Sequence, residues 1–188
     1  MKKSGSHPSS HARRRFLRHT ALACGAFGAL AALPALALGA PRPRTLRFVH
    51  THTGETLNTT YFNGADYDAA ALVNVNHLLR DFRTGDARRI DPALLDILWA
   101  LQSQADHTDT FEIISGYRSP VTNAMLHRRS HGVAEHSQHM LGKAIDLRLT
   151  GYSTRRLSEH ARALSLGGVG YYATSDFVHV DTGRVRFW

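Results

Sequence analysis

The order of the patterns along the sequence predicts an α+β fold, an antiparallel sheet with helices packed mainly on one side. Apolar residues recur at helical spacing in much of the first half of the folded region. Short stretches in which apolar and polar residues alternate dominate the second half, with one more helical stretch between them. The chain has 188 residues, which is enough for one such core. We therefore expect a single folded domain at residues 45–188.

Strands are predicted where apolar and polar residues alternate, and helices where apolar residues recur at helical spacing after a capping residue. In chain order we expect strands at 45–50 and 56–62, helices from 66 or 68 to about 83 and from 92 to about 104, a strand at 111–115, a short helix around 121–127, a strand at 143–149, a helix from 153 or 154 to 164, and strands at 169–172, 177–181 and 184–188.

In the first half, glycine and capping residues set the boundaries. Gly54 separates the two opening strands, and either Asp66 or Asp68 is placed to cap the helix that follows. Asp91 and Pro92 predict the start of the second helix, because a capping acid there precedes proline at the first helical position.

In the second half, the alternation of residues 143–149 predicts a strand with Asp146 on one face and apolar side chains on the other. Either Ser153 or Thr154 can cap the next helix. The two strands at 169–172 and 177–181 are close enough in sequence to form a hairpin.

Residues 1–37 are typical of an export signal, and residues 38–44 of a linker. A basic segment with paired arginines before Phe16 and Leu17 precedes a long apolar run, and the run ends in a small-x-small cleavage pattern. The arginine pair favours the twin-arginine type and hence a periplasmic protein; an ordinary secretory signal is the alternative. Pro34 weakens the apolar run as a membrane span, so we expect membrane contact only through an uncleaved signal.

Charge and cysteine content exclude other kinds of site. Of the 23 basic residues, six lie in the first 37 residues, where no acidic residue occurs, so the rest of the chain is nearly balanced. A nucleic-acid-binding domain needs a basic surface on its folded part, and none is expected here. The single cysteine, Cys24, lies in the apolar run, so any metal in the folded domain must be held by histidines and carboxylates.

Two segments of the folded domain combine histidines and acids within apolar strands. Asp146 lies between Ile145 and Leu147, and a buried carboxylate is costly without a partner. A divalent cation bound by His139, Asp146 and His179 would supply that partner and leave one position open for water. From composition alone, a neighbouring arginine or tyrosine could equally satisfy the acid, and the strand histidine could be a core residue.

The ordered motifs resemble a known family. Ser-Gly-Tyr-Arg-Ser at 115–119, Ser-x-His-x6-Asp at 137–146 and Phe-Val-His-Val-Asp-Thr-Gly at 177–183 resemble the zinc peptidases of bacterial cell-wall metabolism. That family includes D-Ala-D-Ala carboxypeptidases, dipeptidases and murein endopeptidases, and it shares its fold with the hedgehog domain. The His-Thr-Gly-Glu segment at 52–55 extends the similarity to the YcbK-like endopeptidase branch.

The resemblance implies one Zn²⁺ bound by His139, Asp146 and His179, on the sheet, in a peptidase that acts on peptidoglycan peptides. It also implies that Arg118 lies beside the metal, where it can bind a substrate carbonyl or acid. The remaining candidates to contact the substrate or orient a ligand are Ser137, Asp181 and Tyr117, and a surface turn acid is the alternative for Asp181.

The proton carrier is the open point of this interpretation. Related carboxypeptidases have a glutamate three residues before the last histidine, and here that position holds Asp176, which is either a catalytic base or a turn residue. His136 is an alternative proton carrier, and an exposed polar loop residue is the other interpretation of it. A non-catalytic zinc module that binds cell wall or a partner protein, and a D-Ala-D-Ala carboxypeptidase, are the alternative functions.

Overall fold

The computed structural model describes residues 42–106, 109–130 and 132–188. The expected export signal at 1–37 and most of the expected linker at 38–44 therefore lie outside the described residues. The first strand already begins at Arg44, the last residue assigned to the linker. Within the described ranges, no helix combines the length and apolar character needed to cross a membrane.

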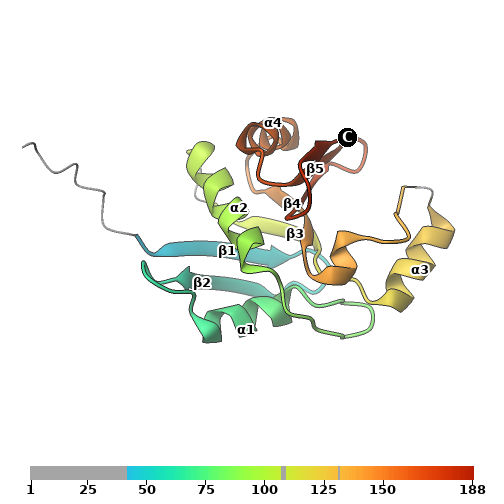
Figure 1. Ribbon diagram of the computed structural model, residues 1–188, viewed down its shortest axis with the longest axis horizontal. Coiled ribbons are helices and arrows are strands. Elements are labelled where there is room, and N and C mark those ends of the chain that lie inside the picture. Colours follow the sequence, from blue (N-terminus) through green and yellow to red (C-terminus); the bar gives the residue numbers. More distant parts are fainter. Residues whose placement is uncertain (1–41, 107–108, 131) are drawn as a thin grey trace, which may run out of the picture. The chain divides into compact units, whose positions relative to one another are not determined.

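The expected elements are present with small shifts at their ends (Figure 1). In chain order they are β1 (Arg44–His50), β2 (Thr56–Phe62), α1 (Ala69–Leu78), α2 (Pro92–Gln104), β3 (Phe111–Ser115), α3 (Pro120–Arg129), the 3-10 helix η1 (Gln138–Leu141), β4 (Ala144–Leu149), α4 (Thr154–Leu164), β5 (Gly168–Tyr172), β6 (Phe177–Asp181) and β7 (Arg186–Phe187). The helix η1 is the one described element that the spacing did not predict.

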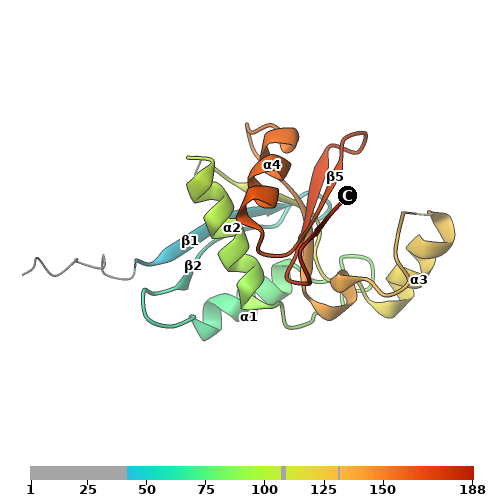
Figure 2. The same ribbon diagram turned by 45° about the horizontal axis from the view of Figure 1, so that its top comes forward.

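The strands of the described region form one sheet in the order β2-β1-β3-β4-β6-β5-β7. Neighbouring strands are antiparallel except for the parallel pairs β1–β3 and β5–β7. Helices α2 and α4 contact each other on one face of this sheet, and both views show them side by side (Figures 1 and 2). The predicted α+β fold with a mainly antiparallel sheet is therefore confirmed.

The two faces of the central strands differ in character. On β4, Ile145, Leu147 and Leu149 belong to the buried apolar core under the helices, together with Leu98 of α2 and Leu157 of α4. Since side chains of a strand alternate between faces, the residues between them point to the face opposite these helices. The strand that anchors the core thus also presents polar residues on its second face.

Helix starts follow the capping signals of the sequence. Asp68, rather than Asp66, accepts a hydrogen bond from the backbone N–H of Ala71 at 2.8 Å, and Asp91 caps α2 in the same way. Ser153, rather than Thr154, caps α4. In each case, a side-chain oxygen satisfies a backbone donor that the first helical turn leaves free.

Helix α1 is shorter than predicted, since it ends at Leu78 and not near Arg83. The backbone carbonyl of Leu79 accepts a hydrogen bond from the N–H of Tyr117 at 2.7 Å. Asp81 is 1% exposed, and its carboxylate accepts the backbone N–H of Ser119 at 2.9 Å. Residues after α1 therefore leave the helix to hold the loop at 116–119, which helical spacing alone does not reveal.

Candidate metal centre

Asp146 and His179 meet because their strands pair in register. Asp146 of β4 lies directly opposite His179 of β6 in the antiparallel ladder, on the face turned away from α2 and α4. Directly opposed residues have neighbouring Cβ atoms, so both side chains reach the same place. The Nδ1 atom of His179 lies 2.8 Å from Oδ1 of Asp146.

His139 reaches the same place from η1, which lies just before β4. The hydroxyl of Ser137 accepts the backbone N–H of His139 at 3.3 Å and caps this short helix. Gly142 ends it with φ of +69°, and a Cβ there would lie 2.3 Å from the carbonyl oxygen of Arg89. Only glycine fits both the left-handed turn and this close approach, so the turn that brings His139 back over β4 depends on it.

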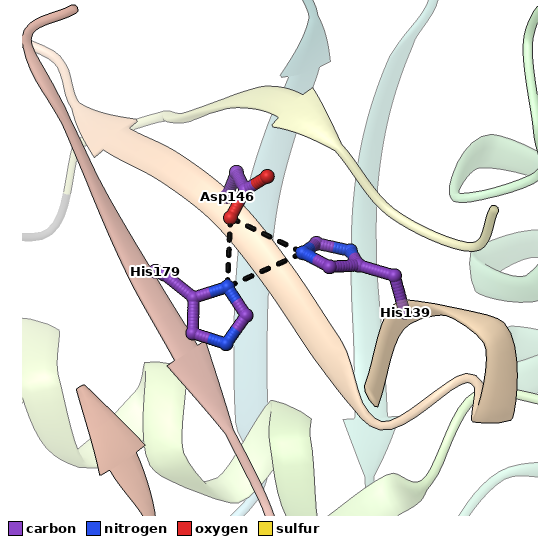
Figure 3. A group of neighbouring side chains, drawn as sticks. All are labelled: His139, Asp146 and His179. Atoms are coloured by element: carbon purple, nitrogen blue, oxygen red, sulfur yellow. Dashed lines mark hydrogen bonds and ion pairs between the residues drawn. The ribbon is translucent and has the colours of Figure 1, made fainter. Parts of the chain in front are cut away.

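The three side chains converge tightly (Figure 3). Nε2 of His139 lies 3.2 Å from both Oδ1 of Asp146 and Nδ1 of His179, and all three residues are buried. They are the one group of three or more potential ligands that the described residues bring together for a metal ion. Two imidazole nitrogens and one carboxylate oxygen form a donor set that suits a catalytic zinc site.

Further hydrogen bonds determine which imidazole nitrogen faces the cluster. Nδ1 of His139 lies 2.6 Å from the carbonyl oxygen of Gly116, and Nε2 of His179 lies 2.9 Å from Oδ2 of Asp181. Both partners are acceptors, so these two nitrogens donate, and the opposite nitrogen of each ring faces the cluster, where it can bind a cation once it carries no proton. Such outer contacts orient histidine ligands in metal sites, and here both rings have one.

The pKa shifts of the cluster follow from burial and from the contacts among its members. Burial raises the pKa of Asp146, but its contacts with His139 and His179 outweigh burial and hold the pKa well below its usual range. Burial lowers the pKa of His139. Burial also lowers the pKa of His179, but hydrogen bonds to Asp146 and Asp181 reverse the direction and raise it. Asp146 is therefore an anion ready to bind a cation.

Arg118 lies beside the cluster, as the family resemblance implies. Its Nη2 donates to Oδ2 of Asp146, and its Nε donates to the hydroxyl of Ser115 at 2.9 Å. The guanidinium lines the same pocket as the three potential ligands. Asp146 thus directs one oxygen towards the histidines and the other towards Arg118.

The pocket over the cluster has contributions from three segments. Arg118 lines it, and the loop that leads into η1 contributes Ser137 and His136. The C-terminal strands and the residues beside them also line it. Their lining residues are mainly aromatic or basic, namely Tyr172, Phe177, Arg186 and Trp188.

Two of the candidate site residues lie elsewhere. Tyr117 is 9% exposed and packs in the apolar core, so the structure does not bring it to the pocket. Asp176 has a positive φ of 50°, accepts the Thr154 hydroxyl at 2.6 Å and pairs with Arg148 at 3.6 Å. It lines a separate pocket, and these contacts are those of the turn residue that the sequence allowed as the alternative.

Two residues near the site were missed from the sequence. Asp81 holds the start of the Arg118 loop, and Arg186 donates to both oxygens of Asp181. Asp81 lies within the helix that the sequence predicts up to about residue 83, so its contact with the distant loop was not expected. A signal for Arg186 existed in the acid at Asp181, because a strand acid beside a histidine calls for a basic partner.

Comparison with known proteins agrees with this site. Residues 39–188 match the family model described as peptidoglycan L,D-endopeptidase MepK. The chain is 41% identical over 177 residues to the Escherichia coli K12 protein of that name, covering 94% of this chain and 96% of the relative. It is 42% identical over 149 residues to a probable peptidoglycan L,D-endopeptidase MepK of Haemophilus influenzae, covering 79% and 80%. The chain therefore belongs to the MepK family of peptidoglycan peptidases.

Proposed function

We propose that the chain is a zinc-dependent endopeptidase that hydrolyses an L,D peptide bond in the cross-links of peptidoglycan. The observation that carries this proposal is the buried group of His139, Asp146 and His179, which line a pocket and have ligand atoms 2.8 to 3.2 Å apart. The names of the relatives supply the bond type, and their activity favours an endopeptidase over a carboxypeptidase or a non-catalytic zinc module.

The chain's own residues have distinct tasks in this proposal. His139, Asp146 and His179 hold the ion, and its chemistry there is Lewis acidity, which polarises a peptide carbonyl and makes water more acidic. Arg118 donates hydrogen bonds to the carbonyl oxygen of the scissile bond as charge develops on it. Gly116 and Asp181 keep the two imidazoles oriented.

We assign the transfer of the water proton to His136. Among the described residues that line the pocket, it is the one imidazole outside the ligand group. Asp176 points its carboxylate at Thr154 and Arg148 and is not used. Ser137 lines the pocket and contacts the substrate in addition to capping η1.

Peptidoglycan lies outside the cytoplasmic membrane, so this function requires export. The basic and apolar segment at 1–37 supports a periplasmic location through the twin-arginine route. Replacement of the paired arginines by lysines in a tagged full-length chain tests the route. We expect the protein to remain in the cytoplasmic fraction, whereas unchanged periplasmic recovery would favour the ordinary secretory route.

The function itself is tested by digestion of purified muropeptides. The protein, with and without a chelator, is incubated with two sets of dimers, one joined by an L,D bond and the other by a D,D bond. We expect mass spectrometry to show monomers only from the L,D-linked set and only while zinc is present. Absence of any product with zinc present would refute the enzyme, and cleavage of the D,D-linked set alone would refute the bond assignment.

A further inference from the structure

The C-terminal strand β7 reaches the metal centre through one arginine. The Nη1 and Nη2 atoms of Arg186 donate to Oδ1 and Oδ2 of Asp181 at 3.0 and 2.7 Å. The Asp181 side chain is fully buried, whereas that of Arg186 is 31% exposed. A bidentate arginine–carboxylate pair of this kind fixes the plane of the carboxylate as well as its position.

Asp181 passes this constraint on to a potential ligand. Its Oδ2 atom accepts one hydrogen bond from Nη2 of Arg186 and another from Nε2 of His179, the latter at 2.9 Å. The nitrogen on the other side of the same ring, Nδ1, is the one that faces Asp146 and His139. The orientation of His179 therefore depends on where the carboxylate of Asp181 is held.

The backbone around the pair leaves room for it. A Cβ on Gly168 would lie 2.3 Å from Nη1 of Arg186 and 2.5 Å from Oδ2 of Asp181. The backbone N–H groups of Gly168 and Gly183 also donate to Oδ1 of Asp181, at 3.3 and 2.8 Å. The carboxylate thus has several donors, but Arg186 is the residue that supplies a balancing positive charge from outside the ligand group.

We propose that Arg186 is a positioning residue of the metal centre, which holds His179 in its ligand orientation through Asp181. This inference rests on the zinc site of the proposed function. Without Arg186, the buried carboxylate loses its balancing cation and the bidentate pair that fixes its plane. The backbone N–H groups of Gly168 and Gly183 still hold its Oδ1 atom, but the His179 ring is held less firmly towards Asp146. Zinc should then bind more weakly even though all three ligands are present.

The test compares zinc affinity in three variants. Arg186→Met removes the charge and keeps an aliphatic stem, Arg186→Lys keeps the charge but not the two-pronged geometry, and Arg184→Met removes an exposed charge two residues away. Zinc dissociation constants are measured by competition with a chromophoric chelator, and thermal unfolding is measured on the zinc-free proteins.

We expect Arg186→Met to weaken zinc binding about tenfold, the lower end of the range for direct partners of a metal ligand, because Arg186 acts on His179 through Asp181. The zinc affinity of Arg186→Lys should fall less, but at least about threefold on the same basis. The zinc affinity of Arg184→Met should stay within about twofold of the parent value. Lower thermal stability of zinc-free Arg186→Met with unchanged zinc affinity would show a purely structural role and overturn the inference.

The remaining outcomes also decide the matter. If Arg186→Met does not fold, parent-like affinity in Arg186→Lys overturns the inference while leaving the zinc site intact. A parent protein that binds no zinc refutes the proposed function, and the inference fails with it. Parent-like zinc binding by both Arg186 variants refutes the inference alone.

Discussion

The two faces of the central sheet are made by the same strands but are held together by different forces. On the helix-covered face, Leu147 and Val178 are fully buried among apolar side chains. On the other face, Asp146 and His179 alternate with them and are also buried, but among hydrogen bonds and charges. Apolar burial is non-directional, whereas the polar contacts require defined atoms at defined distances. The first face therefore supplies stability and the second supplies a site.

The largest effect should come from breaking the polar face at His179. His179→Ala removes one potential zinc ligand, and we expect zinc binding and muropeptide cleavage to fall to background because two ligands hold the ion poorly. The apolar face is untouched, so far-UV circular dichroism should show a folded protein. The same substitution at His77, an exposed residue, is the control. Full activity in His179→Ala would disprove the site.

The apolar face is tested at Leu147. Leu147→Ala leaves a cavity under α4, and we expect a loss of about 2–5 kcal/mol in the free energy of unfolding, measured by urea denaturation. Leu141→Ala, a half-exposed leucine on η1, should cost less than about 0.5 kcal/mol. The zinc affinity of the folded fraction should be unchanged. Weakened zinc binding in Leu147→Ala would show that the two faces are not separable.

On the polar face, His136 and Asp176 can be compared directly as candidates for the proton carrier. His136→Gln should lower kcat about 100-fold by removing the proton carrier, with zinc content retained. Asp176→Asn should keep kcat within about twofold, a small change for a turn residue outside the pocket. Steady-state kinetics with L,D-linked dimers measures both. The opposite ranking of the two variants would return the role of base to Asp176.

The smallest effect concerns Asp81, which links α1 to the Arg118 loop. Asp81→Asn removes a buried charged acceptor and should cost about 1–3 kcal/mol of unfolding free energy at neutral pH. Asp66→Asn, an exposed acid, is the control and should change little.

The stability difference between the parent and Asp81→Asn should depend on pH. Burial raises the pKa of Asp81, but hydrogen bonds from Thr122, Ser119 and Arg83 outweigh burial and lower it. As pH falls, the unfolded chain is protonated at this residue first, so its contribution is present above the unfolded pKa and is lost as pH falls through the folded pKa. The difference in stability between parent and Asp81→Asn should therefore shrink below about pH 4. A difference that stays constant down to pH 2 would contradict this.

Most of the fold could be predicted because its signals are local. Asp91 and Pro92 mark the start of α2 within two residues, and alternation places Asp146 opposite the core residues of β4. Family resemblance then predicted the three potential ligands, which the structure brings together, and the family itself is confirmed. The end of α1 was predicted wrongly because helical spacing continues to Phe82, while contacts with the distant loop at 116–119 end the helix at Leu78.

The sequence by itself determined the α+β fold, the strand alternation and the residue types of a His-Asp-His group, because spacing and capping act over a few residues. Only the tertiary structure decided what surrounds that group. It turned Asp176 towards Arg148, buried Tyr117 in the core, and joined Asp181 to both His179 and Arg186. These outcomes depend on strand register and loop paths, which bring together residues that no local pattern connects.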